Sequence, residues 1–530
     1  GYRRCAASAE WSGLPRWSHV MTLLVLLVCG CTGSQRASQA PPAGSPAAAL
    51  AAATKGPLAL VEDRFRARRA ADVSGFSLLD SNRDGLRWRM ALIDAAQRSL
   101  DFQYYMWLGD TSGKLLLERV LAAADRGVKV RILVDDLSTM LEDETHLTLR
   151  DHVAAVIDGH PNVEIRLFNA WRSRSLLGRV LESAGDAERA NQRMHNKLMI
   201  ADNHAAIIGG RNIGDHYFGL ATSFNFRDLD VLGIGPVSRQ ASGVFDRFWN
   251  SAWVVPVAAL DIAVTPGQME RLRAALPGGS AADGELAESW LDATDWSAAF
   301  ADLPRSLHAG TSVVHTDSAD TDEVAHHMPV AIRALLATAR EQVLITNAYV
   351  IPGAHAIERI REQVAAGVDY RILTNSLASH DVPAVNSHYK VWRPRLLAAG
   401  VQLYEVRPDA AVHSLLADTP PVRSDFMGLH AKAMVIDRQR VFVGSLNLDP
   451  RSWAINSEMG VVIESPALAQ VLAEVMMRDM LPENAWRVIR RDDGELQWTA
   501  GAEVHASQPA RDFWQRIEDV IFMAFPADLY

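Results

Sequence analysis

The chain has 530 residues, which is long enough for several domain-sized units and at least one sizeable hydrophobic core. Hydrophobic residues make up 48% and charged residues 22%, which is the usage of a globular protein and excludes a disordered, collagen-like or disulfide-scaffold chain. The formal net charge of −10 argues against a protein that coats DNA or RNA.

An apolar run, MTLLVLLVCGC over residues 21–31, follows several arginines and has the layout of an export signal. It is too short to cross a bilayer, which needs roughly twenty apolar residues. All three cysteines lie at or before residue 31, so no disulfide is expected in the rest of the chain. The end of the run resembles a bacterial lipobox, and this resemblance implies that Cys31 is lipidated after cleavage. An ordinary cleaved signal is the alternative.

The segment after this run is rich in Ala, Ser, Pro and Gly, which predicts a flexible tether. Pro-Gly turns and an acidic, Ala-rich stretch mark a second boundary further along the chain. The predicted organisation is a signal with a lipobox at 1–31, a linker at 32–57, a first half at 58–254, a connection at 255–310 and a second half at 311–530.

Two segments far apart in the chain, residues 104–137 and 348–377, have the same pattern. Each predicts a short strand, an amphipathic helix, a turn at Gly127 or Gly367 and a second strand. Matching Arg131 to Arg371 gives an offset of 240 residues (371 − 131). Two such β-α-β units predict a duplicated α/β fold, with a parallel or mixed sheet covered by helices.

A second pair of repeats, at 194–212 and 429–447, contains the polar residues. Both copies have His-x-Lys-x4-Asp, then an apolar segment, then a Gly and an Asn. The matching residues are His195, Lys197, Asp202, Gly209 and Asn212 in the first copy and His430, Lys432, Asp437, Gly444 and Asn447 in the second. Two of only six lysines in the chain lie in these motifs, so chance is a weak explanation for two copies.

The spacing places the histidine and the lysine of each copy on one face of an extended segment. If the halves pack about a pseudo-twofold axis, two imidazoles and two ammonium groups converge, and Asn212 and Asn447 add amide donors. Such a pocket fits a phosphodiester. One histidine attacks phosphorus, the other protonates the leaving alcohol, and the lysines stabilise the equatorial oxygens. We expect no metal ion and no cofactor.

These motifs are similar to the two HKD motifs of the phospholipase D superfamily. Within that superfamily, Gly209–Asp215, Phe226–Asp230 and Gly444–Ser452 resemble the bacterial cardiolipin synthases that lack N-terminal membrane helices. The resemblance implies an α/β fold of two duplicated phospholipase D-like α-β-α halves, packed about a pseudo-twofold axis around one shared active site. It also implies a two-step exchange, in which a phosphatidyl-histidine forms and a second lipid or water resolves it.

The resemblance further implies the roles of individual residues. His195 is expected to attack and His430 to act in acid-base steps, whereas the motif aspartates are orienting groups. Ser445 has no counterpart hydroxyl in the first copy, so we expect an asymmetric site. The implied catalytic residues are His195, Lys197, Asp202, His430, Lys432 and Asp437, the substrate-binding residues are Asn212, Ser445 and Asn447, and the supporting residues are Asp228 and Glu458. Solvation at a strand end is the alternative for Asp228 and Asp230.

Several functions remain open from the sequence. The leading one is phosphatidyl transfer that makes cardiolipin or a related lipid, and the first alternative is a phospholipase D that uses water. A nuclease is disfavoured by the net charge of −10, and an inactive lipid-binding scaffold by the two intact motifs. The expected partners are phospholipid substrates and a membrane surface, with no nucleic acid, and a need for an accessory protein stays open. We expect the protein in the cell envelope, held by its N-terminal lipid.

Two flanking segments each allow two interpretations. Arginines before the first motif either gather anionic headgroups or belong to a solvated helix. They are Arg172, Arg174, Arg179, Arg189 and Arg193. The C-terminal segment predicts an amphipathic helix that either dips into lipid or packs on its own domain. Its apolar positions are Phe513, Trp514, Ile517, Val520, Ile521 and Ala524.

Overall fold

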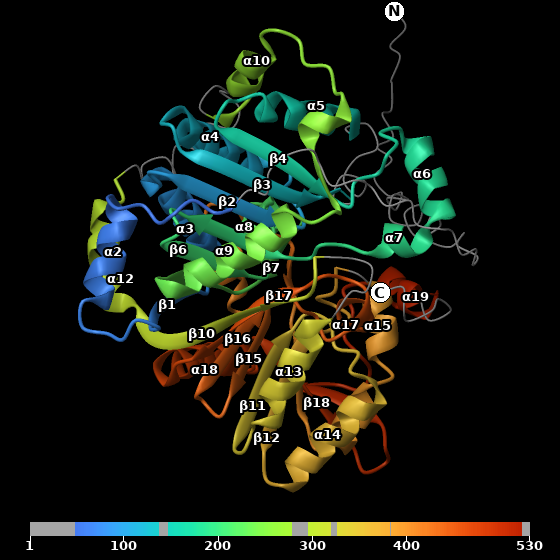
Figure 1. Ribbon diagram of the computed structural model, residues 1–530. Coiled ribbons are helices and arrows are strands. Elements are labelled where there is room, and N and C mark those ends of the chain that lie inside the picture. Colours follow the sequence, from blue (N-terminus) through green and yellow to red (C-terminus); the bar gives the residue numbers. More distant parts are fainter. Residues whose placement is uncertain (1–47, 137–146, 278–294, 320–325, 382, 522–530) are drawn as a thin grey trace, which may run out of the picture.

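The computed structural model describes residues 48–136, 147–277, 295–319, 326–381 and 383–521. The export signal, Cys31, most of the tether and Ala524 lie outside these residues. Figure 1 shows two stacked halves, the first blue to green and the second yellow to red, each with helices against a sheet. Within the described ranges, no helix is long and apolar enough to cross a membrane.

The first half is built on a mixed sheet with the strand order β9-β4-β3-β2-β5-β6-β8-β1, in which only β2, β3 and β4 run parallel. The strands are β1 (Ser74–Leu79), β2 (Ser99–Tyr104), β3 (Lys129–Asp135), β4 (Val163–Phe168), β5 (Lys197–Ala201), β6 (Ala205–Gly209), β7 (Phe224–Arg227), β8 (Asp230–Ile234) and β9 (Val254–Pro256). The helices are α2 (Pro57–Arg66), α3 (Asn82–Ala95), α4 (Thr111–Asp125), α5 (Leu147–Asp158), α6 (Leu176–Gly185), α7 (Ala187–Asn191), α8 (Asp215–Phe218), α9 (Pro236–Trp249), η2 (Val257–Leu260) and α10 (Gln268–Ala274).

The second half repeats this plan in the order β10-β17-β16-β15-β11-β12-β13-β18-β19-β20, with β11, β12 and β13 parallel. The strands are β10 (His308–Thr316), β11 (Gln342–Asn347), β12 (Asp369–Asn375), β13 (Gln402–Val406), β14 (Phe426–Leu429), β15 (Lys432–Ile436), β16 (Arg440–Gly444), β17 (Met459–Glu464), β18 (Ala485–Arg490), β19 (Leu496–Ala500) and β20 (Glu503–His505). The helices are α13 (His327–Ala337), α14 (Gly353–Ala365), α15 (Pro383–Tyr389), α16 (Arg393–Ala398), η4 (His413–Ala417), α17 (Pro450–Ala454), α18 (Pro466–Asp479) and α19 (Phe513–Ile521). One more helix, α12 (Ser297–Ser306), precedes β10 in the segment between the halves.

The two sheets join edge to edge where β1 pairs antiparallel with β10, with Ser74 opposite Gly310. Strands at equal distance from this junction correspond, so β8 matches β17, β6 matches β16, β5 matches β15 and β2 matches β11. A separate parallel pair, β7 with β14, also crosses between the halves. The predicted fold, two duplicated α/β halves about a pseudo-twofold axis, is confirmed.

Both predicted β-α-β units are present. In the first, α4 begins after Asp110, whose carboxylate accepts the backbone N–H of Gly113 at 3.1 Å. It ends before Gly127, where a φ of 96° suits glycine, and β3 then pairs parallel with β2. The second unit repeats this arrangement with α14, Gly367 at a φ of 98°, and β12 parallel to β11.

A hydrophobic core between the halves supports the central strands. It combines Leu198 and Ile208 of β5 and β6 with Val435 and Val443 of β15 and β16. Burial of each such side chain contributes about 1.5–3 kcal/mol. The strands that hold the two motifs therefore pack against one shared hydrophobic core.

The described α-helices of the segment predicted as the connection, α10 and α12, pack on the first half. Helix α12 packs against α2, and Phe300 and Leu303 belong to the first half's core. The residue boundaries of the predicted domains stay a prediction.

Candidate active site

Each His-x-Lys motif lies at the start of a central strand, because β5 begins at Lys197 and β15 at Lys432. Lys197 Nζ donates to the carbonyl oxygen of His195 at 2.6 Å, and Lys432 Nζ donates to that of His430. Both lysines are buried, whereas the histidine side chains are 12% and 8% exposed. The imidazoles are therefore closer to the surface than the ammonium groups behind them.

The backbone of each histidine is held by the opposite half. The N–H of His195 donates to the carbonyl oxygen of Ser457 at 2.8 Å, and that of His430 to the carbonyl oxygen of Arg227 at 2.9 Å. Both bonds cross between the halves, so neither histidine is positioned by its own half alone.

The residue after each of these carbonyls is a buried acid that contacts the histidine ring. His195 Nδ1 lies 3.0 Å from Glu458 Oε2, and His430 Nδ1 lies 2.7 Å from Asp228 Oδ2. An ionised carboxylate only accepts, so we assign the Nδ1 proton to these bonds. Nε2 of each imidazole is then left for chemistry.

The electrostatics show that the four motif groups share one site. Burial and the charges of Lys197 and Lys432 hold the pKa of His195 well below its ordinary value. Burial and the same lysines lower the pKa of His430 to about 3. Burial also lowers the pKa of Lys432 to about 8 and that of Lys197 well below its usual range. Both imidazoles are therefore neutral in the free protein at pH 7.

The two carboxylates differ in protonation. Burial raises the pKa of Glu458 to about 7, against the opposing effects of Lys197 and of hydrogen bonds. Burial also acts to raise the pKa of Asp228, but the close contact and hydrogen bond with His430 and the charges of Lys432 and Arg211 outweigh it and leave that pKa below its ordinary value. Asp228 is therefore ionised at neutral pH, whereas Glu458 titrates there.

A hydroxyl supports only one of these carboxylates. The Ser445 hydroxyl donates to Glu458 and accepts the backbone N–H of Met459 at 3.0 Å. Its counterpart is Gly210, where a Cβ would lie 2.3 Å from Asp228 Oδ1. The close approach of Asp228 excludes any side chain at this position, so the predicted asymmetry is built into the packing.

Two tyrosines that the motif analysis missed line the histidines. The ring centroid of Tyr105 lies 5.2 Å from that of His195, and Tyr217 lies 5.1 Å from His430, both edge-on. Asn212 donates its amide to the Tyr217 hydroxyl at 2.9 Å. Tyr105 directly follows β2 in the first β-α-β unit, which is the one sequence signal that pointed to it.

Asp230 and Asn447 have different surroundings. Asp230 pairs with Arg89 at 3.0 Å and with Arg211 at 3.1 Å, and both arginines are buried. It therefore stabilises the fold beside the site.

Among the described residues, Asn447 Oδ1 is buried and has no hydrogen-bond partner, so it can accept a bond from a substrate hydroxyl.

The motif aspartates lie beyond the opposite ends of their strands, in tight turns where Asp202 and Asp437 both have a φ of 52°. The Asp202 carboxylate accepts the backbone N–H groups of residues 97–99 at 2.7–3.0 Å. The Asp437 carboxylate accepts those of residues 340–342 at 2.8–3.2 Å. They hold the starts of β2 and β11, and the structure does not bring them to the histidines.

Comparisons with known proteins match the parts of the chain that contain both motifs. The family model described as "Cardiolipin synthase, PLD-like domain" matches residues 90–249 and 332–480. The chain is 35% identical to cardiolipin synthase C of Escherichia coli (strain K12) over 454 residues, which is 84% of this chain and 93% of the relative. The chain belongs to the cardiolipin synthase family of phospholipase D-like proteins. It is accordingly an enzyme of the phospholipase D superfamily.

Proteins of lower sequence identity also match this chain. The chain is 24% identical to the major cardiolipin synthase ClsA of Bacillus subtilis (strain 168) over 406 residues, or 76% of this chain and 68% of the relative. The crystal structure of phosphatidylserine synthase from Haemophilus influenzae Rd KW20 superposes with a TM-score of 0.52 at 12% identity, covering 80% of this chain and 91% of that one. This likeness supports the duplicated fold.

Within this cardiolipin synthase family site, the structure gathers most of the predicted residues. His195, Lys197, His430, Lys432, Asp228, Glu458 and Ser445 are linked by the contacts above, whereas Asp202 and Asp437 are not. In the part of the chain that the structure describes, no group of three or more His, Cys, Asp or Glu side chains is arranged to hold a metal ion.

Four of the five arginines before the first motif pair with acidic side chains of the protein. Arg174 and Arg179 pair with Asp151, Arg189 pairs with Glu182, and Arg193 pairs with Asp135 at 3.3 Å. Only Arg172 of the five is exposed. Their charge is largely used inside the fold.

Proposed function

We propose that this enzyme transfers phosphatidyl groups between phospholipids and makes cardiolipin or a related lipid. The supporting observation is the pair of neutral imidazoles, each with its Nδ1 on a buried carboxyl group and each next to both lysines. Two groups of this kind suit two displacements at phosphorus, because one group attacks and the other moves the proton.

In the first step, His195 Nε2 attacks the phosphorus of the donor lipid and forms a phosphorus–nitrogen bond. The bond to the donor's alcohol breaks, and His430 Nε2 gives its proton to the leaving oxygen. In the second step, His430 takes the proton of the acceptor hydroxyl, whose oxygen attacks phosphorus and releases His195. The Lys197 and Lys432 ammonium groups stabilise the charge on the equatorial oxygens.

His430 must be protonated before the first step, and binding of the substrate favours this protonation. In the free enzyme, burial and the two lysines keep this imidazole neutral. The negative charge of a bound phosphodiester offsets the lysine charges and raises the pKa of His430, and the anionic Asp228 favours the imidazolium further. The acid therefore forms when the substrate is in place.

The proposal also includes a membrane attachment. Lipidation of Cys31 would hold the enzyme in the cell envelope next to its substrates, with residues 32–57 as the tether. Mass spectrometry of the N-terminal peptide from envelope fractions checks this part, and a Cys31→Ser variant is the control. An unmodified thiol at Cys31 in the mature protein would contradict it.

The central experiment is mass spectrometry of lipid products after incubation with phosphatidylglycerol, with and without phosphatidylethanolamine. Cardiolipin that is absent with His195→Ala supports transfer and identifies the donor. Phosphatidic acid as the only product would make the enzyme a phospholipase D instead. No lipid product in any mixture, including one supplemented with envelope extract, would contradict the proposal.

A further inference from the structure

Two amphipathic helices of this protein are inverted. A helix on a globular protein normally buries its apolar stripe and exposes its polar one. In α6 of the first half and α19 of the second, the polar side faces the protein and large apolar side chains face outward. Of the predicted C-terminal apolar positions that the structure describes, Phe513, Trp514, Val520 and Ile521 are exposed and Ile517 is half-buried.

In α19, the exposed side chains include Phe513 and Trp514, each 70% exposed, and Val520, 66% exposed. The helix is fixed through its two buried polar residues. Asp519 pairs with Lys390 at 2.7 Å and accepts the amide of Asn386 at 2.6 Å. Gln515 donates to the carbonyl oxygen of Leu377. These buried bonds fix the rotation of the helix about its axis, so its apolar side stays outward.

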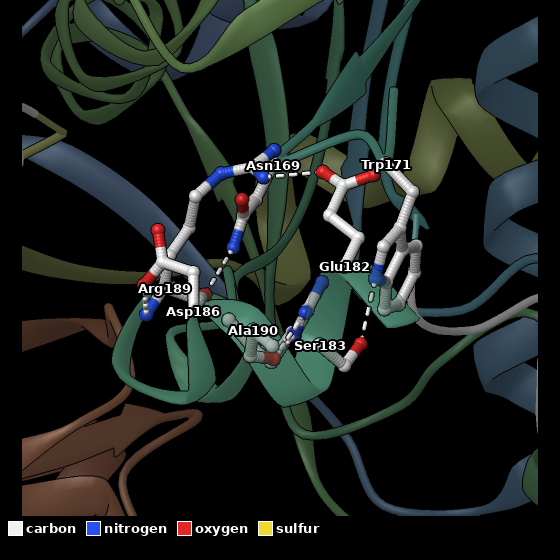
Figure 2. Close-up of a pocket in the computed structure, with 8 residues that line it drawn as sticks. Asn169, Trp171, Glu182, Ser183, Asp186, Arg189 and Ala190 are labelled. Carbon is white, nitrogen blue, oxygen red and sulfur yellow. Dashed lines mark hydrogen bonds and ion pairs between the residues drawn. The ribbon is translucent and has the colours of Figure 1, made fainter. Parts of the chain in front are cut away.

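In α6, Leu177 and Leu181 lie one turn apart and are 70% and 64% exposed. The opposite side of the helix is bonded inward. Ser183 accepts the indole N–H of Trp171 at 2.9 Å, and the carboxylate of Glu182 accepts from Arg189 at 2.6 Å. Figure 2 shows these side chains lining a small pocket next to the helix.

Both helices connect to the active site through short chains of contacts. The ring centroid of His430 lies 5.0 Å from that of Phe226. The Phe226 centroid lies 5.1 Å from that of Phe224, which in turn lies 5.1 Å from that of Phe426. The guanidinium of Arg511, two residues before α19, lies 3.7 Å from the Phe426 ring centroid.

On the side of the first half, the guanidinium of Arg193 lies 4.6 Å from the Trp171 ring centroid. Arg193 is two residues before His195, and Trp171 is the residue bonded to α6. In Figure 1, α6 and α19 lie on the same side of the molecule, and α2 lies on the opposite side.

We propose that the outward faces of α6 and α19 form a two-point surface that docks on a phospholipid bilayer and presents the active site to it. The surface is defined by Leu177, Leu181, Phe513, Trp514, Val520 and Ile521. The proposal rests on the proposed function, since the bilayer is where its phospholipid substrates reside.

The composition of the surface favours a lipid occupant. Trp and Phe side chains concentrate at membrane interfaces, and apolar helix faces with nearby cations bind there. Arg172 before α6 and Arg516 on α19 are exposed and suit anionic headgroups. The net charge of −10 gives no general attraction to such headgroups, so these local groups must supply it.

The first test compares a variant with Leu177→Ser, Leu181→Ser, Phe513→Ser and Trp514→Ser with its parent. The matched control carries Leu60→Ser on α2 and Val330→Ser on α13, at positions 48% and 58% exposed. Each is assayed on phosphatidylglycerol vesicles and on short-chain phosphatidylglycerol below its micelle concentration. We expect about a tenfold or greater loss of turnover on vesicles for the four-site variant only. On the short-chain lipid, we expect all three proteins to agree within about twofold.

Unchanged turnover on vesicles, or an equal loss on both substrates, would overturn the docking surface. If the parent is inactive on both substrates, the lipid mixtures described above test the proposed function, and a second measurement that needs no turnover decides the docking. That measurement places an environment-sensitive fluorophore at Val520→Cys or, as control, at Leu60→Cys, with Cys5, Cys29 and Cys31 replaced by Ser in both chains.

Phosphatidylglycerol vesicles whose acyl chains carry a quencher are then added to each labelled chain. A blue shift and quenching at position 520, absent at position 60, support docking. No response at position 520 overturns it. A label at position 520 that is already shielded before lipid is added also overturns it, because another part of the chain or a second copy then covers this face.

Discussion

The two histidine centres of this enzyme are built alike and charged differently. His430 faces Asp228, which the surrounding cations keep ionised, whereas His195 faces Glu458, which burial brings to a pKa of about 7. A hydroxyl from Ser445 supports only Glu458. A duplicated fold thus supplies two similar imidazoles, and the small differences behind them suit the two different tasks of the proposed mechanism.

The largest expected effect comes from removing either imidazole. His195→Ala and His430→Ala should each lower turnover of natural lipid by about 10⁴-fold or more with unchanged melting temperature. The variants should diverge on phosphatidyl p-nitrophenol, whose leaving group needs no proton. A nitrophenolate burst is expected with His430→Ala but not with His195→Ala, and a burst with only His195→Ala would reverse the assigned roles.

The carboxylates should give unequal losses. Asp228→Asn removes a permanent charge behind His430, the proposed acid-base group, and we expect turnover to fall about 10³-fold, whereas Glu458→Gln should lower it about tenfold. Steady-state rates at pH 8 with both lipids in excess measure the difference. Equal losses would show that the two centres are electrostatically equivalent, against the comparison above.

The pH dependence should depend on Glu458. Below a pH of about 7 this carboxyl is protonated and is a weaker acceptor for the Nδ1 proton of His195. As the pH rises through about 7, the carboxylate forms, Nε2 becomes more nucleophilic, and the rate of phosphohistidine formation increases. Single-turnover rates across this range should show the rise in the parent, and its persistence in Glu458→Gln would assign it to another group.

Exchanging the small residues behind the carboxylates should give a smaller effect. Ser445→Gly copies the first half and removes one hydrogen bond to Glu458, so we expect kcat/KM to fall about fivefold. The reverse change is not symmetric, because a side chain at Gly210 meets Asp228 at 2.3 Å. Gly210→Ala should lower the melting temperature, and a variant as stable as the parent would contradict this packing argument.

The smallest kinetic effect is expected at the motif aspartates. Asp202→Asn and Asp437→Asn weaken the caps of backbone N–H groups at the starts of β2 and β11 without touching the histidines. We expect the free energy of unfolding to fall by about 1–3 kcal/mol each while turnover stays within about twofold. Urea unfolding beside steady-state assays separates the two outcomes, and a large loss of turnover at full stability would give these residues a chemical role.

Local features of the chain were predictable from the sequence, whereas the contacts between its two halves were not. The β-α-β units follow from apolar periodicity and glycine turns, and the pairing of His195 with Lys197 on one face follows from strand geometry. Glu458 lies 263 residues from His195, so only tertiary packing could assign it to that ring and not to His430. The outward direction of α6 and α19 was equally hidden, because helical spacing gives a stripe but not the side that faces the protein.

Each histidine contacts a carboxyl group from the opposite half, so neither histidine centre can form during biosynthesis until both halves have been made. During translation, the first half is made with His195 and Lys197 in place, but its ring partner is still missing. The surroundings of His195 are completed only after residue 458 has left the ribosome and the second half has closed onto the first. A truncated or half-made chain therefore cannot turn over the lipids of the cell that is producing it.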